Sequence, residues 1–281
     1  MDINNTFEEI IEQGKMNIKA EPGDYINEED GLLYCGKCHT KKQTIVNIFG
    51  RIRKPMCVCT CEAERMEAKK KEEKRQEFER KVKRLRRSGF PKSEMAEWTF
   101  ENDDMKNPKI TKAMENYANN FHDFMKKGQG LLLYGNCGTG KTYAACEVAN
   151  ALIDEGYPVL ATNFARLTNT LQGMYEGKQT YIDSLNGFSL LIIDDLGAER
   201  TSEFMQEMIY TIIDSRYRAG LPMIITTNMD ISKIKNPANV EQARIYDRII
   251  ERCFPIKVTG ESRRRGKIKE NYNHLKDLLG I

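Results

Sequence analysis

From residue 91 onward, hydrophobic residues occur in short unbroken runs, separated by longer stretches in which they recur at helical spacing. A short aliphatic run is typical of a strand that is buried on both faces. Such strands alternating with helices predict a parallel sheet covered by helices on both sides, which is an α/β fold. The expected strands are residues 131–134, 158–163, 189–194, 222–228 and 254–259.

A charged segment precedes this pattern. Between Glu62 and Arg87, Lys and Arg outnumber Glu, and only Phe78, Val82 and Leu85 form an apolar stripe at helical spacing. The spacing predicts a helix of which most of the length is not core. It fits a solvated linker and a surface for nucleic acid or a partner protein equally well. We therefore expect a small N-terminal module at 1–62, a charged helical linker at 63–90 and an α/β domain at 91–281.

Composition and charge narrow the class of protein. The chain has 281 residues and a formal net charge of +3, so it is not a polycation as a whole. No apolar run approaches the roughly 18 residues that a membrane span requires. The first residues are acidic where a secretion signal is basic. We expect a cytoplasmic protein without a membrane partner.

The residues GNCGTGKT, at 135–142, lie between the first expected strand and a helix. Glycines let the backbone curl so that successive N–H groups point inward around phosphate oxygens. The lysine adds a positive charge, and the threonine adds a hydroxyl for a metal ion. A helix N-terminus after the loop favours anions, so the segment predicts a P-loop. The candidate nucleotide-binding residues are Gly135, Asn136, Cys137, Gly138, Thr139, Gly140, Lys141 and Thr142.

Polar side chains follow two of the expected strands. Asp194 and Asp195 come directly after SLLII, and Asn228 ends PMIITTN. In P-loop enzymes an acid on a neighbouring strand holds Mg²⁺, so we expect Asp194 and Thr142 to bind it. Asp195 would orient or deprotonate the attacking water, and Asn228 would position that water. The alternatives are purely structural roles, in which the two acids cap a strand and the asparagine forms a turn.

Arginines form two groups near the expected nucleotide site. Arg244, Arg248 and Arg252 share one face of the helix expected at 239–253, and 263–265 follow the last strand. Guanidinium groups bind a transferred phosphoryl group, also from a neighbouring subunit, but a solvated face shows the same spacing. The segment TNMD lacks the lysine of the guanine-reading Asn-Lys-x-Asp motif, so adenine is favoured.

Five of the eight cysteines crowd between Cys35 and Cys61. In a reducing compartment such a cluster indicates metal rather than disulfides. Two close groups of thiolates suit tetrahedral Zn²⁺, with an iron–sulfur cluster as the less favoured alternative. Cys57 and His39 are further candidates, but the last two cysteines lead into a helix whose N-terminus favours thiolates. The expected zinc ligands are Cys35, Cys38, Cys59 and Cys61.

In their order and spacing, GNCGTGKT, LLIIDDLGAE, ITTN, ARIYDRI and GESRR resemble the AAA+ ATPase core of the DnaC/DnaI family of helicase loaders. They resemble the IstB-type transposase helper ATPases more distantly. The resemblance covers roughly residues 90–270 and implies a doubly wound parallel sheet of strand order 5-1-4-3-2. It also implies ATP hydrolysis, a hexameric replicative helicase and single-stranded DNA as partners, and self-association in the ATP state.

The resemblance also implies roles for single residues. Lys141 and Thr142 correspond to Walker A, Asp194 and Asp195 to Walker B, and Asn228 to sensor 1. The class usually has Glu where Asp195 stands, so we expect slow hydrolysis that acts as a switch. The remaining implied roles are the arginine finger for Arg248, with Arg244 as second choice, and sensor 2 for Arg264.

Few residues follow the last expected strand, so we expect no helical lid, and closure of the site would come from a neighbouring subunit or a partner. The expected function is ATP-dependent loading of a replicative hexameric helicase onto single-stranded DNA, with helicase docking by the N-terminal module inferred by analogy. Alternatives are an IstB-like transposase helper and a zinc-stapled adaptor that binds ATP only to set its shape. DNA-contact candidates are the end of the basic helix and an expected loop at 165–183, without assigned sites.

Overall fold

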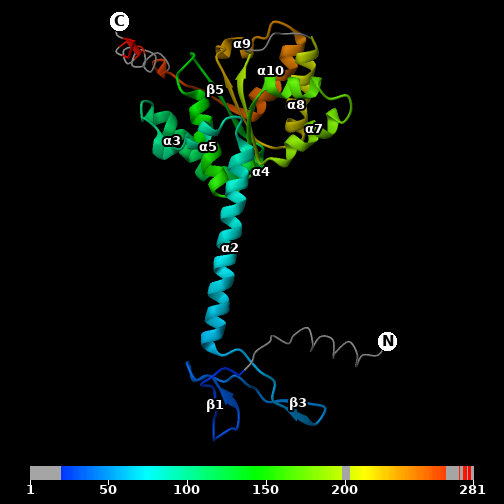
Figure 1. The fold of residues 1–281 in the computed structure, drawn as a ribbon. Helices are drawn as coiled ribbons and strands as arrows, with labels where there is room; N and C mark the ends of the chain where they lie inside the picture. Colours follow the sequence, from blue (N-terminus) through cyan, green and yellow to red (C-terminus); the bar gives the residue numbers. More distant parts are fainter. Residues whose placement is uncertain (1–19, 198–202, 264–271, 273–274, 277, 280–281) are drawn as a thin grey trace. The chain divides into compact units, whose positions relative to one another are not determined.

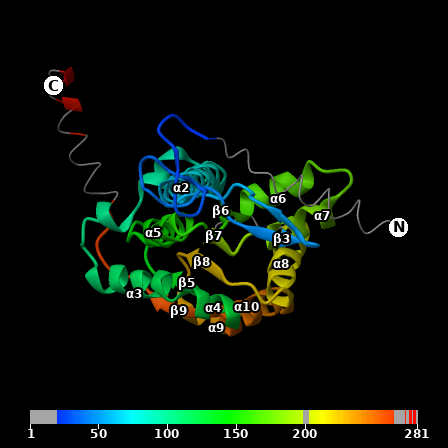
Figure 2. The same ribbon diagram turned by 90° about the horizontal axis from the view of Figure 1, so that it is seen from below.

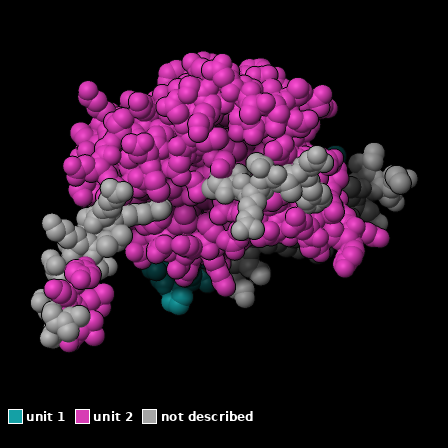
Figure 3. Space-filling model, turned by 90° about the horizontal axis from the view of Figure 1, so that it is seen from above, with its two compact units in different colours: residues 1–77 teal, residues 78–281 magenta. Residues whose placement is uncertain are grey.

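The computed structural model describes residues 20–197, 203–263, 272, 275–276 and 278–279 (Figure 1). The chain divides into two compact units, of which the first ends at Glu77 and the second begins at Phe78 (Figure 3). The expected sensor 2 residue, Arg264, lies outside the described residues. None of the helices in the described ranges combines the length and the apolar character that a membrane span needs.

The first unit contains two short antiparallel hairpins. Tyr25 pairs with Tyr34 in the first hairpin, and Val46 pairs with Arg53 in the second. Its interior is small and partly polar, because Lys42 donates a buried hydrogen bond to Asp24 at 2.6 Å. This bond lowers the pKa of Asp24 to about 2. A unit with so little apolar interior needs an additional staple. Its strands are β1 (Tyr25–Ile26), β2 (Leu33–Tyr34), β3 (Val46–Ile48) and β4 (Arg51–Arg53).

Helix α2 (Thr60–Gly89) confirms the helix expected between Glu62 and Arg87. Most of its side chains are exposed, as its charge pattern predicts. At its end, Gly89 is buried, and a Cβ there would lie 2.7 Å from the carbonyl oxygen of Val159. The helix therefore ends where its backbone meets the sheet, and Pro91 follows. The division between the two units falls inside this helix, so the three expected parts 1–62, 63–90 and 91–281 stay a prediction.

A five-stranded parallel sheet forms the centre of the second unit. Its order is β6-β7-β8-β5-β9. When the strands are numbered along this unit, the order reads 2-3-4-1-5, which is the expected 5-1-4-3-2 from the opposite edge. The expected α/β fold and strand order are therefore confirmed. The strands are β5 (Gly130–Tyr134), β6 (Val159–Asn163), β7 (Leu190–Leu196), β8 (Met223–Thr227) and β9 (Cys253–Lys257).

Side chains alternate between the two faces of this sheet. Leu131 and Leu133 pack into one hydrophobic layer, whereas Leu132 packs into the other. Figure 2 shows α3 and α5 on one side of the strands and α8 on the other. The first layer includes α3 (Pro108–Asn119), α4 (Phe121–Lys127) and α5 (Lys141–Asp154). The second includes α6 (Phe164–Gln172), α7 (Lys178–Ser184), α8 (Glu203–Arg218), α9 (Ile231–Lys235) and α10 (Val240–Arg252).

One expectation about this unit was wrong. Residues 165–183, expected as a loop, contain most of α6 and most of α7. Phe164, Leu167 and Leu171 are buried at helical spacing, and the side chain of Asn163 caps the first turn by accepting from the N–H of Arg166 at 2.8 Å. Three short 3₁₀ turns complete the described elements: η1 (Ser93–Glu97), η2 (Phe100–Asn102) and η3 (Leu185–Gly187).

Candidate functional site

The expected P-loop connects the end of β5 to the start of α5. Gly135, Gly138 and Gly140 have φ angles of 143°, 83° and 97°, which side chains with a Cβ rarely adopt. A Cβ at Gly135 would also lie 2.3 Å from the carbonyl oxygen of Val258. The hydroxyl of Thr139 donates to the carbonyl oxygen of Asn136 at 3.0 Å, which holds the curl from inside. The glycine pattern is thus required by the backbone.

Lys141 is buried at the first position of α5. Its Nζ donates hydrogen bonds to the carbonyl oxygens of Gly135 at 2.9 Å and Asn136 at 2.7 Å. A further bond reaches Oδ1 of Asn228, directly after the neighbouring strand β8, at 2.8 Å. These acceptors keep the ammonium group at the loop, where it can neutralise the charge of a bound phosphate.

One carboxylate oxygen joins two hydroxyl groups next to the loop. Thr142 donates to Oδ1 of Asp194 at 2.8 Å, and Thr226 donates to the same oxygen at 2.6 Å. The structure therefore brings together the expected magnesium ligands Thr142 and Asp194. No local pattern in the sequence marks Thr226, because its contact with Asp194 depends on β8 lying beside β7.

Asp195 has a left-handed backbone, with φ of 63°, at a register shift between Ile193 and Leu196. Its N–H donates to Oγ1 of Thr226 at 2.9 Å, which supports this unusual conformation. Its Oδ1 accepts from Nδ2 of Asn228 at 2.8 Å. A continuous series of hydrogen bonds therefore joins Lys141, Asn228 and Asp195.

An open pocket of about 1140 Å³ lies in front of these residues. This volume is sufficient for a nucleotide. Two segments far apart in sequence form its outer wall, and they are joined where Nδ2 of Asn107 donates to the carbonyl oxygen of Thr259 at 2.8 Å. Trp98 and Tyr143 stack at the same pocket with ring centroids 5.5 Å apart.

Arg263, at the end of the described range 203–263, contacts the P-loop. Its N–H donates to the carbonyl oxygen of Gly138 at 3.0 Å, and its guanidinium lies 3.2 Å from Asp104 and 3.5 Å from Asp103. Glu147 lies close to Arg263 and Asp103, and burial together with the negative charge of Asp103 raises its pKa to about 8. In the sequence, Arg263 stands out only as one of three consecutive arginines, and no pattern marks Glu147.

The expected arginine finger lies elsewhere in this unit. Nε of Arg248 donates to Oδ1 of Asp214 at 2.7 Å, and the guanidinium stacks on the ring of Tyr210 at 4.7 Å. Among the described residues, those that line the nucleotide pocket do not include Arg248. Arg244, one turn earlier, is exposed. On the opposite side of α10, Tyr246 and Ile249 are buried and Ile250 is half-buried, and Cys253, the first residue of β9, is also buried.

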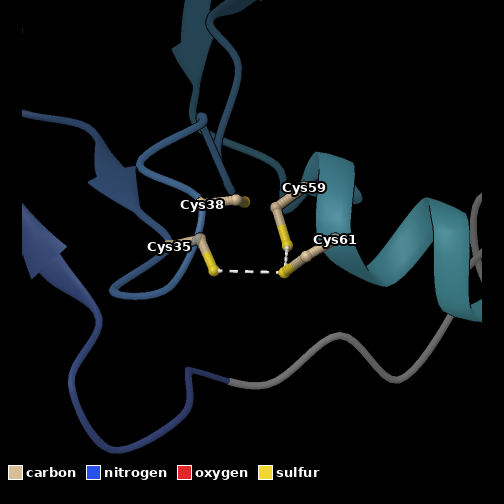
Figure 4. Close-up of side chains that lie close together, drawn as sticks. All are labelled: Cys35, Cys38, Cys59 and Cys61. Atoms are coloured by element: carbon tan, nitrogen blue, oxygen red, sulfur yellow. Dashed lines mark hydrogen bonds between the residues drawn. The ribbon is translucent and has the colours of Figure 1, made fainter.

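Four cysteine sulfurs meet in the first unit (Figure 4). The Sγ atoms of Cys35, Cys38, Cys59 and Cys61 all lie within 4.8 Å of one another. Cys61 Sγ is 3.6 Å from Cys35 and 3.5 Å from Cys59. Tetrahedral zinc with bonds of about 2.3 Å places its sulfur ligands about 3.8 Å apart, so this cluster fits zinc.

The remaining zinc candidates have other partners. Cys57 donates from its Sγ to the carbonyl oxygen of Lys41 at 3.4 Å, and Nδ1 of His39 is 3.3 Å from the hydroxyl of Tyr25. The hydrogen bond with Thr40 lowers the pKa of Cys38 to about 5, and contact with three sulfurs raises the pKa of Cys61 to about 12. Such crowding of thiols is what a cation relieves.

The fold and the site define a P-loop ATPase domain of the AAA+ class. Residues 60–271 match the family described as IstB-like ATP binding protein, and the chain belongs to this family. A crystal structure of DnaI has a TM-score of 0.53 and 26% sequence identity, and the match covers 61% of this chain and 96% of that one. The resemblance stated from the motifs is confirmed.

Two relatives show both branches of this resemblance. The replicative helicase loader DnaI of Bacillus subtilis is 30% identical over 209 residues, which are 66% of this chain and 64% of the relative. A putative insertion sequence ATP-binding protein of Sinorhizobium fredii is 28% identical over 173 residues, which are 59% of this chain and 57% of the relative. The chain thus spans less than two thirds of either relative's own length.

Proposed function

We propose that this protein loads a replicative hexameric DNA helicase onto single-stranded DNA in an ATP-dependent manner, in the cytoplasm. The observation that carries the proposal is the assembled nucleotide site, Lys141, Thr142, Asp194, Asp195 and Asn228, in a chain similar to a protein named as a replicative helicase loader. ATP binding would assemble the loader on the helicase, and hydrolysis would release it.

Each residue of the site has a distinct task in this proposal. The P-loop amides and Lys141 bind the phosphates, and Asn228 helps to position the attacking water between the γ-phosphate and Asp195. The oxygens of Thr142 and Asp194, 2.8 Å apart, are of the kind that Mg²⁺ prefers. When bound there, Mg²⁺ neutralises charge on the phosphate oxygens. The sequence segment TNMD favours adenine as the base.

Hydrolysis is proposed to be slow. The carboxylate of Asp195 is one methylene shorter than the Glu usual in this class, and it is held by Asn228 at 2.8 Å. A shorter side chain reaches less far toward the attacking water, so the barrier is higher. A turnover on the order of 10 per second without partners, typical of fast enzymes, would contradict this proposal.

Completion of the site is proposed to need a second subunit. Within its own chain, Arg248 is bonded to Asp214 and Tyr210. To act as an arginine finger, its guanidinium must break these bonds and reach the nucleotide of a neighbouring subunit. Arg244 stays the second choice because it is exposed on the same helix. Arg264, proposed as sensor 2, lies outside the described residues. ATP would therefore couple binding to self-association.

The first unit is proposed to bind one Zn²⁺ through Cys35, Cys38, Cys59 and Cys61. Their mutual distances fit four sulfur ligands, and the small interior of the unit needs such a staple. Cys35, Cys38 and Cys59 precede residues 60–271, which match the ATP-binding family. A unit added ahead of the shared ATPase suits the docking of a partner, and we propose the helicase as that partner.

Co-purification tests the main proposal. The full chain and the hexameric helicase encoded by the same genome are mixed with Mg-ATP, with Mg-ADP or without nucleotide, and the Arg248→Ala variant serves as control. We expect a complex whose amount depends on the nucleotide. Absence of any complex in all three states would contradict helicase loading.

The alternative is a DNA-binding helper ATPase of a transposase. It is supported by the similarity to an insertion sequence ATP-binding protein and by the family to which the chain belongs. ATP-dependent assembly on DNA, without a complex with the helicase in any nucleotide state, would favour this alternative. The cysteine unit favours the loader, because the helper has no need of a helicase-docking domain.

A further inference from the structure

Strands β3 and β4 form a two-stranded hairpin, and we call residues 45–54 the β3–β4 arm (Figure 1). Phe49 and Gly50 form its two-residue turn, with φ angles of 50° and 79°. A turn with two positive φ angles prefers Asn-Gly, because asparagine tolerates the left-handed conformation. A bulky aromatic residue at the first position is costly, so burial or function must compensate for it.

Among the described residues, none buries Phe49, so burial does not compensate for the cost of this turn conformation. Phe49 is 98% exposed, and Ile45, Ile48 and Ile52 are 52%, 43% and 70% exposed. Ile48 pairs with Arg51 and Asn47 pairs with Ile52, so the two isoleucines lie on opposite faces of the ribbon. Apolar side chains therefore project from both faces and from the tip. A two-stranded hairpin with both faces in water is marginally stable, so this arm fits a surface that is covered by a partner.

The charges of the arm are all of one sign. Arg51, Arg53 and Lys54 are exposed on β4 and directly after it. From Lys41 to Cys61 the sequence contains no Asp or Glu. A partner surface that covers the arm must therefore combine an apolar groove with acidic side chains, because like charges across an interface are unfavourable.

Two observations connect the arm with a partner protein rather than with the ATPase or with nucleic acid. The arm precedes residues 60–271, which match the ATP-binding family, so the nucleotide chemistry shared by that family does not require it. Its exposed apolar side chains are three isoleucines and one phenylalanine. Bases stack on aromatic rings, and isoleucine offers no such platform.

We propose that the β3–β4 arm is the surface by which this protein docks on its helicase, with Phe49 as the residue that enters an apolar groove rimmed by acidic residues. This inference rests on the proposed function, which makes the hexameric helicase the partner. Aromatic side chains in the centre of an interface contribute most of its binding energy, and peripheral charges mainly affect the rate of association and the salt dependence.

The variant Phe49→Asn tests the proposal without disturbing the hairpin. Asn-Gly is the preferred sequence for this turn, so the variant keeps or improves the backbone while it removes the apolar tip. The measurement is the dissociation constant of the full chain for the helicase of the same genome. We expect binding to weaken at least about tenfold, with zinc content and ATP binding unchanged. Phe254→Ser, which removes an exposed phenylalanine of the second unit, is the matched control and should bind normally.

The charge component has its own variant. Arg51→Glu combined with Arg53→Glu should weaken binding more at low salt than at high salt. Equal binding by wild type and Phe49→Asn would overturn the inference and leave the proposed function standing. Loss of single-stranded DNA binding by Phe49→Asn, with normal helicase binding, would make the arm a nucleic-acid surface and also overturn it. No helicase binding by the wild type would overturn the proposed function and the inference with it.

Discussion

Thr226 donates a hydrogen bond to Asp194 at 2.6 Å and accepts one from the N–H of Asp195 at 2.9 Å. A single hydroxyl therefore orients the carboxylate that is proposed to hold Mg²⁺ and fixes the backbone of the residue proposed to position water. Thr226 is buried in the central part of the sheet, where its neighbours do not shift easily. We infer that it is a positioning residue for both acids.

Replacing Thr226 with valine removes the hydroxyl but keeps the shape of the side chain. We expect the turnover number to fall roughly tenfold to a hundredfold, which corresponds to one or two lost hydrogen bonds to a charged site. Binding of ATP should change little, because Lys141 and the P-loop remain. Thr226→Ser should restore most of the turnover, and Thr211→Val, at a half-buried site on α8 away from the nucleotide pocket, should behave as wild type. A purely structural role would reduce thermal stability and binding together.

Asp195→Asn separates a hydrolytic switch from an adaptor that only binds ATP. The amide is of the same size and can still contact Asn228, but it cannot take a proton from water. We expect ATP-dependent assembly to persist while hydrolysis falls at least about a hundredfold. Release from the helicase, followed by gel filtration after a limited amount of ATP, should stop. An adaptor would work normally with this substitution. Lys141→Ala cannot distinguish the two, because it removes ATP binding as well.

The zinc proposal can be tested with two cysteines that are close in sequence. Cys59→Ser removes a ligand from the four-sulfur cluster, whereas the sulfur of Cys57 donates to the carbonyl oxygen of Lys41. We expect one Zn²⁺ per chain in the wild type and in Cys57→Ser, and less than half of this in Cys59→Ser. Metal analysis of the purified full-length variants measures it. Equal loss of metal in both variants would contradict the four-sulfur assignment.

Glu147 should make the stability of the second unit depend on pH. Burial raises the pKa of this carboxyl to about 8, and Asp103, Glu115 and Asp104 add to the rise while Arg263 opposes it. The folded state then holds a proton that the unfolded state loses near its ordinary pKa of 4.5. The contribution of Glu147 to the free energy of unfolding is therefore fully present below about pH 4.5, and it is lost as the pH rises toward 8.

Glu147→Gln keeps the shape of the side chain and removes the titration. We expect its melting temperature to exceed that of the wild type at pH 8, by on the order of a few degrees, and to differ less at pH 5. Thermal unfolding followed by circular dichroism from pH 5 to pH 9 measures this difference. A constant difference across that range would show that folding does not raise the pKa of Glu147.

The features that were predicted from the sequence are the ones encoded locally. Aliphatic runs gave the strands, and glycine spacing gave the P-loop, because each depends on neighbouring residues. The contact of Thr226 with both acids depends on which strands are adjacent and on their register, which no local pattern contains. The contacts of Arg263 with Gly138 and Asp104 likewise join segments more than 100 residues apart. The roles of Thr226 and Arg263 therefore could not be predicted from local sequence patterns, because they depend on contacts between distant segments.

Arg248 tests whether the site is shared between subunits. In one chain its guanidinium is bonded to Asp214 and stacked on Tyr210, so Arg248→Ala should lower the stability of the contact between α8 and α10 as well as hydrolysis. Arg248→Lys keeps a charge near Asp214 but loses the planar group that binds phosphate at two points.

Mixing variants distinguishes a role in the neighbouring subunit from a structural role. Subunits with Arg248→Ala retain an intact P-loop, and subunits with Lys141→Ala retain Arg248. If Arg248 acts on the next subunit's nucleotide, each variant alone should be inactive, and a mixture of the two should regain part of the ATPase activity. If the mixture stays as inactive as its components while both variants fold and assemble, Arg248 serves only its own chain and Arg244 becomes the candidate for the neighbour's site.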